Sequence, residues 1–231
     1  MTRVTINSIA SIHVYLCRNR LLLQLGLSKL FLNLLDPIIN RRSITKLDAL
    51  DTHIRSTREV VREPGRPKLP EYLMDGARCN EALDRYYAER NPKFRTLLHG
   101  DTHMGNVYFT ADKRIGFLDW SAFHFGSCFH DVVYHMTAML SIEDRRAHEM
   151  EILDHYLETL HKLGGPKFDR HNDPEVMIEY RRSFMTNVIW LICPNGLQSK
   201  ERVDVLCERT VATYNDHKVI DVLLNPPKPT S

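Results

Sequence analysis

Apolar residues recur at three- and four-residue intervals through most of the second half of the chain, which is the spacing of a helix with one buried face. The longest such run is Ile152, Leu153, Tyr156, Leu157, Leu160 and Leu163. Ser141, with Asp144 three residues later, predicts the start of this helix, and Gly164-Gly165 predicts its end. Further helices are predicted over residues 71–89, 131–140, 173–192 and 199–224.

A short β region interrupts this helical pattern. Leu97-Leu98 leads into a polar loop, and two apolar stretches, 107–110 and 115–118, are separated by the four polar or small residues 111–114. This arrangement predicts a β-hairpin. The fold class is therefore α+β and mainly helical, with a small hairpin among the helices.

The first part of the chain has a different pattern. Residues 4–39 are rich in Leu and Ile, but Arg18, Arg20 and Lys29 interrupt every apolar run before it is long enough to span a membrane. We expect an amphipathic helix that packs on the protein, with a helix lying in a membrane interface as the less favoured alternative.

Proline and glycine positions suggest four parts. An N-terminal helical segment, 1–62, is followed by a linker, 63–70, where Pro64, Gly65, Pro67 and Pro70 disfavour a helix. The main unit is expected over 71–225, and the proline-rich tail 226–231 is expected to be disordered.

Composition narrows the possible partners and location. The 231 residues carry a net charge of +2, which gives no reason to expect nucleic acid as a partner. The five cysteines are odd in number and widely spaced, and none forms a Cys-x-x-Cys pair. A disulfide framework is therefore not expected. We expect a reducing, cytoplasmic location.

Candidate chemistry is concentrated in one polar stretch. Residues 99–106 read His-Gly-Asp-Thr-His-Met-Gly-Asn, and Asp119-Trp120 follows thirteen residues after Asn106. If the hairpin turn is centred between Asp112 and Lys113, Asn106 and Asp119 face each other across the two strands. An amide oxygen beside a carboxylate suits Mg²⁺, and Asp101 would face the same space, free to orient or deprotonate a substrate hydroxyl.

The combined pattern resembles the C-terminal lobe of the aminoglycoside phosphotransferase and choline-kinase-like superfamily, which has a protein-kinase-like fold. The resemblance covers roughly residues 70–225 and is strongest over 95–140. It implies transfer of the γ-phosphoryl group of ATP to a hydroxyl of a small molecule, with Mg²⁺. By the same resemblance, Asp101 is the catalytic base, Asn106 and Asp119 hold the metal, and the supporting loop residues are His99, His103 and Asp131.

The chain departs from this superfamily before the polar stretch. The superfamily places a β-rich lobe there, with a glycine-rich loop and a phosphate-binding lysine. The only glycines before Gly100 are Gly26, Gly65 and Gly76, and none of the upstream lysines lies in a β pattern. We therefore expect the N-terminal β lobe to be missing, and we identify no nucleotide-binding lysine.

Three functional hypotheses follow. The first is an ATP-dependent small-molecule kinase, either truncated or completed by a lobe not in this chain. The second is an inactive pseudokinase or binding module. The third is a non-haem iron enzyme that uses His99 and Asp101 with a distant histidine, and the helical pattern downstream disfavours it. The pattern identifies neither the acceptor alcohol nor the oligomeric state.

Overall fold

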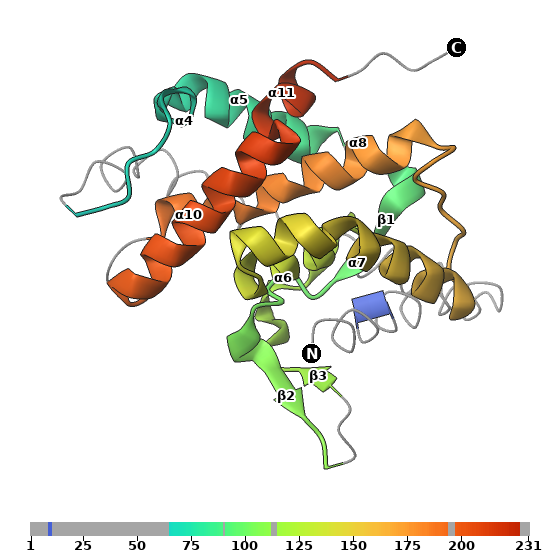
Figure 1. The fold of residues 1–231 in the computed structure, drawn as a ribbon. Helices are drawn as coiled ribbons and strands as arrows, with labels where there is room; N and C mark the ends of the chain where they lie inside the picture. Colours follow the sequence, from blue (N-terminus) through green and yellow to red (C-terminus); the bar gives the residue numbers. More distant parts are fainter. Residues whose placement is uncertain (1–8, 11–64, 90, 112–114, 194–196, 227–231) are drawn as a thin grey trace.

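The structure is a computed structural model that describes residues 9–10, 65–89, 91–111, 115–193 and 197–226. Helices make up most of this part of the chain (Figure 1). They are α4 (Glu71–Met74), α5 (Gly76–Ala88), α6 (His130–Met139), α7 (Ile142–Lys162), α8 (Pro174–Ser183), α9 (Val188–Ile192), α10 (Lys200–His217) and α11 (Val219–Leu224). Short 3₁₀ helices are η2 (Pro92–Phe94), η3 (Met104–Asn106), η4 (Trp120–Ala122) and η5 (Phe184–Asn187). The predicted mainly helical fold with a small hairpin is confirmed at this level.

The predicted capping residues start the long helices. The side chains of Ser141, Asp173 and Ser199 each accept a hydrogen bond from a backbone N–H two or three residues later. These bonds satisfy N–H groups that have no partner within the helix. Helices α7, α8 and α10 therefore begin where the sequence predicts.

Three helices predicted as continuous are broken. The helix expected over 71–89 divides at Asp75, whose side chain accepts the backbone N–H of Arg78 and so starts α5. The helix expected over 173–192 tightens into 3₁₀ geometry over Phe184–Asn187. The last helix turns at Lys218, which adopts a left-handed backbone with φ of 49°. Apolar spacing continues across these breaks, so the pattern alone does not reveal them.

The strands form two antiparallel pairs. Strand β1 (Arg95–Leu98) pairs with β4 (His124–Ser127), and β2 (Val107–Phe109) pairs with β3 (Ile115–Phe117). The second pair is the predicted hairpin, and it projects from the helical body (Figure 1). Strand β4 was not predicted, because a four-residue segment with one large apolar side chain becomes a strand only through pairing with the distant β1.

The predicted hairpin register is wrong by one residue. Val107 pairs with Phe117, and Phe109 pairs with Ile115, so five residues rather than four lie between the strands. The backbone N–H of Leu118 donates to the backbone oxygen of Asn106, at 2.8 Å. Asn106 therefore faces Leu118, and Asp119 lies one residue beyond the last cross-strand pair.

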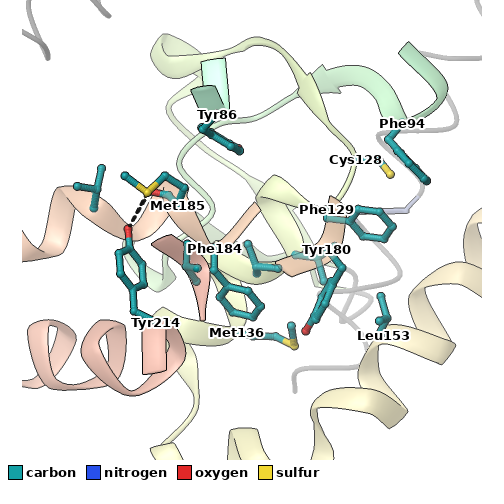
Figure 2. Close-up of a cluster of buried hydrophobic side chains, with 14 of the residues drawn as sticks. Tyr86, Phe94, Cys128, Phe129, Met136, Leu153, Tyr180, Phe184, Met185 and Tyr214 are labelled. Atoms are coloured by element: carbon teal, nitrogen blue, oxygen red, sulfur yellow. Dashed lines mark hydrogen bonds between the residues drawn. The ribbon is translucent and has the colours of Figure 1, made fainter. Parts of the chain in front are cut away.

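A large core joins the helices around α6. Figure 2 shows its centre, where Phe129, Phe184 and Tyr180 pack together. The rings of Phe129 and Tyr180 meet edge to face, with centroids 5.8 Å apart. Helix α6 packs against α7, α8 and α10. Its N-terminal end is therefore held firmly beneath the polar loop that precedes β2.

Some predictions fall outside the described residues. These are the N-terminal helical segment 1–62 apart from Ile9 and Ala10, the absence of a β-rich lobe there, and most of the tail. In the part of the chain that the structure describes, none of the helices is both long and apolar enough to cross a membrane.

Candidate active site

Helix α6 holds the loop that follows β1. Asp131, in the first turn of α6, is almost fully buried. Its carboxylate accepts the backbone N–H groups of His99, at 2.8 Å, and Gly100, at 2.9 Å. Its backbone oxygen accepts the hydroxyl of Thr102, at 2.8 Å. A buried carboxylate is stable only with such partners, so Asp131 and the loop fix each other.

The loop turns sharply at Gly100. Its φ is +84°, a conformation that residues with a side chain rarely adopt. A Cβ atom at this position would lie 2.3 Å from the backbone oxygen of Ala122. Glycine is therefore required here for both conformation and space, and the turn points the next residue, Asp101, out of the core.

Asp101 is hydrogen-bonded through both carboxylate oxygens. The hydroxyl of Tyr134 donates to Oδ1, at 2.9 Å, and Nδ2 of Asn106 donates to Oδ2, at 3.2 Å. Nε2 of His103 lies 3.5 Å from Oδ2. The Asp101 side chain nevertheless keeps 33% of its surface exposed. The carboxylate is thus oriented and still accessible to a substrate.

His99 connects the loop to the end of the hairpin. Its Nδ1 accepts the backbone N–H of Asp101, at 3.2 Å, so this nitrogen carries no proton. Nε2 then carries the proton and donates to the backbone oxygen of Leu118, at 2.8 Å. The imidazole is fully buried and therefore braces the segments that precede Asp101 and Asp119.

The amide of Asn106 has a defined orientation. Its Nδ2 donates to both the backbone oxygen and the carboxylate of Asp101, at 2.9 and 3.2 Å. Since Nδ2 faces Asp101, the amide oxygen Oδ1 points the other way. Asn106 thus turns its donor toward Asp101 and leaves its amide oxygen for another partner.

Asp119 follows β3 by two residues and has a left-handed backbone conformation. Its φ of 50° and ψ of 75° are left-handed, which is rare for residues other than glycine, asparagine and aspartate. The side chain is exposed, and its Oδ1 accepts the backbone N–H of Ser121, at 3.1 Å. Residues other than glycine in this region cluster at functional sites.

A comparison with known families adds to this geometry. The model of the ecdysteroid kinase-like family matches residues 36–164, which include the whole loop, the hairpin and α6. The chain belongs to this family. No curated protein and no solved structure matches the chain significantly.

Membership in the ecdysteroid kinase-like family refines the earlier resemblance. This family belongs to the protein-kinase-like and choline-kinase-like superfamily, so the broad assignment is confirmed, and it suggests kinase-like transfer of phosphate to small molecules. The narrower likeness to aminoglycoside phosphotransferases is not supported. The match begins at residue 36, upstream of the predicted linker 63–70.

The iron-enzyme hypothesis finds no support in this ecdysteroid kinase-like chain. Among the described residues, no group of three or more His, Cys, Asp or Glu side chains is arranged to hold a metal ion. His99 uses both ring nitrogens within the protein. The β-sandwich that such an enzyme would need is replaced by helices after residue 130.

Two residues of α6 that contact the loop were not predicted to do so. Tyr134 bonds to Asp101, and Nδ1 of His135 lies 2.7 Å from the backbone oxygen of Thr102. They follow Asp131 by three and four residues, which places all three on one helix face. That spacing is the signal that could have identified them. As a result, each residue from 99 to 102 is hydrogen-bonded to α6.

Proposed function

We propose that this protein transfers the γ-phosphoryl group of ATP to a hydroxyl group of a small molecule, with Asp101 as the general base. The observation that carries the proposal is the carboxylate of Asp101, which is oriented through both oxygens yet one-third exposed. The ecdysteroid kinase-like match supports the reaction class.

In the proposed reaction, the acceptor hydroxyl hydrogen-bonds to the exposed part of the Asp101 carboxylate. Asp101 takes the proton as the acceptor oxygen bonds to the γ-phosphorus. The bond from that phosphorus to the bridging oxygen of ADP breaks, and ADP leaves with the electron pair. The protein contributes mainly by positioning, since phosphoryl transfer has a loose transition state.

Asn106 and Asp119 are the residues that we propose hold Mg²⁺. The amide oxygen of Asn106 faces away from Asp101, and Asp119 presents an exposed carboxylate at the end of β3. Two protein oxygen ligands are enough, because Mg²⁺ takes its other ligands from water and phosphate. When bound, the ion would neutralise charge on the phosphate oxygens.

An ecdysteroid is the first acceptor to test, because the family model carries that name. We expect Mg-ATP and an ecdysteroid to give a phosphate ester, detected by mass spectrometry. Asp101→Asn should lower this rate about a hundredfold or more, since it removes the base. Asp144→Asn, an exposed change on α7, is the matched control and should leave the rate unchanged. Equal rates for the wild type and Asp101→Asn would contradict the proposal.

The second candidate is an inactive binding module. It is favoured by residues 1–98, which contain three glycines and no Gly-x-Gly-x-x-Gly loop to cover phosphates. Calorimetric titration with Mg-ATP separates the two candidates. Binding together with slow ATP hydrolysis supports the kinase, whereas hydrolysis no faster than in Asp101→Asn supports the binding module.

A further inference from the structure

We infer that Tyr134 is a positioning residue for the reaction, one that aims the carboxylate of Asp101 at the acceptor hydroxyl. This inference rests on the proposed function. Tyr134 lies one helical turn after Asp131 on α6, so the residue that holds the loop backbone and the residue that holds the base share a helix face. The Tyr134 hydroxyl donates to Oδ1 of Asp101, at 2.9 Å.

The hydrogen bonds of Asp101 divide its two oxygens between different partners. Tyr134 holds Oδ1 from the helix, and Asn106 holds Oδ2 from the loop, with His103 also near Oδ2. Two bonds on opposite oxygens fix both the position and the plane of the carboxylate. Each oxygen has a second lone pair, so the group can still accept a substrate proton.

Tyr134 is itself held in one place. Only 5% of its surface is exposed, and it packs with Trp190 and Leu206 in a small buried cluster. Its ring stacks on Trp190, with centroids 5.8 Å apart and planes 27° apart. The Tyr134 ring also stacks on the ring of His130, with centroids 6.4 Å apart. A side chain with so little freedom can orient Asp101 at almost no further cost in entropy.

The hydroxyl of Tyr134 also keeps its proton. Burial raises the pKa of Tyr134 well above its ordinary value, and the nearby negative charge of Asp101 raises it further. The phenol therefore remains a donor to Asp101 throughout the neutral pH range. It does not compete with Asp101 as a base.

Tyr134→Phe tests this inference, with Tyr156→Phe as a matched control. Tyr156 is also a buried tyrosine with a bonded hydroxyl, but it donates to the backbone oxygen of Cys128, at 2.9 Å, in the core. Both variants remove one oxygen atom and one hydrogen bond. The 231-residue wild type and both variants are compared for Mg-ATP hydrolysis, with and without an ecdysteroid.

We expect Tyr134→Phe to lower kcat about tenfold or more, as for loss of a hydrogen bond to a charged group, with KM for Mg-ATP unchanged. Tyr156→Phe should retain the wild-type kcat while losing about as much thermal stability as Tyr134→Phe. Unchanged kcat in Tyr134→Phe, or equal losses in both variants, overturns the role of Tyr134 and leaves the proposed function standing. A wild type no more active than Asp101→Asn overturns both.

A spectroscopic signature gives a readout that does not require activity. A buried hydroxyl proton bonded to a carboxylate should give a slowly exchanging, low-field proton resonance. We expect this signal in the wild type and in Tyr156→Phe, its loss in Tyr134→Phe and its displacement in Asp101→Asn. A Tyr134 hydroxyl signal that Asp101→Asn leaves unmoved overturns the inference, even in an active enzyme.

Discussion

The carboxylate of Asp131 accepts the backbone N–H of Gly100 at a distance of 2.9 Å, and this bond ties the turn before Asp101 to the first turn of α6. The other carboxylate oxygen holds the backbone N–H of His99. Both bonds are shielded from water, because Asp131 is only 1% exposed. The stability of the helix end and the geometry of the site therefore depend on the same charged group.

Asp131→Asn is expected to destabilise the fold by about 3 kcal/mol, because an amide NH₂ would replace one of two oxygens that face backbone donors. Urea unfolding measures this loss. Asp154→Asn serves as the control, since its side chain is half exposed and paired with Arg170 at the surface. That change should cost less than about 1 kcal/mol. Equal losses would show that the Asp131 bonds contribute little.

Gly100→Ala is expected to cost more than Gly65→Ala. Both glycines have a φ above +80°, so alanine is strained in both places by about 1 kcal/mol. A Cβ at Gly65 meets only the end of Lys200, at 3.5 Å, whereas at Gly100 it meets a backbone oxygen, at 2.3 Å. The difference between the two unfolding free energies isolates this clash, and we expect it to exceed about 2 kcal/mol. Equal effects would argue against a tight turn at Gly100.

The contribution of Glu149 to the free energy of unfolding is expected to be lost in acid. This buried carboxylate contacts Arg145, accepts the hydroxyl of Tyr180 at 3.1 Å, and lies 2.7 Å from Nε2 of His217. Burial raises the pKa of Glu149, but the bonds and charges of His217 and Arg145 outweigh burial and leave the pKa lowered. Its contribution is therefore present above the unfolded pKa of about 4.3 and is lost as pH falls through the folded pKa.

Glu149→Gln should thus lower the unfolding free energy by about 3 kcal/mol at pH 7 and by much less near pH 3. Thermal unfolding across this range measures the difference. Glu208→Gln, an exposed change on α10, should show no such trend. A difference in unfolding free energy between the wild type and Glu149→Gln that does not change with pH would contradict a lowered pKa for Glu149.

The stability contributed by Glu179 is expected to depend on pH in the opposite direction to that of Glu149. Burial raises the pKa of Glu179, and the opposing effects of Arg182 and Ser127 are smaller. A raised folded pKa favours the fold at low pH, and that advantage is lost as pH rises through the folded pKa. Glu179→Gln should therefore gain stability relative to the wild type between about pH 4 and pH 7. The Tm of Glu179→Gln minus the Tm of the wild type should rise over this range, and a fall in this difference would contradict the prediction.

The helices and the polar loop could be predicted because their signals are local. Ser141, Asp173 and Ser199 cap helices through bonds to residues two or three positions away, so the pattern appears in a short window. The loop residues 99–106 also stand out within one stretch of sequence. The breaks at Asp75 and Lys218 were missed because apolar spacing continues through them.

Long-range relationships could not be predicted in the same way. The hairpin register depends on whether four or five residues form the turn, and the polar residues near 112 do not distinguish these lengths. Strand β4 depends on pairing between Leu98 and His124, which are 26 positions apart. Tyr134 stands three residues from Asp131, but its contact with Asp101 is evident only once α6 is known to lie against the loop.

The two faces of α6 make the loop part of a cooperative unit with the core. One face bonds to residues 99–102, while Val132, Val133 and Met136 are completely buried among the other helices. The amide of Gly100 should therefore exchange with solvent about as slowly as the amides of the core, through global rather than local opening. A destabilising change anywhere in the core would then reduce the population of molecules with an intact site, without altering the site itself.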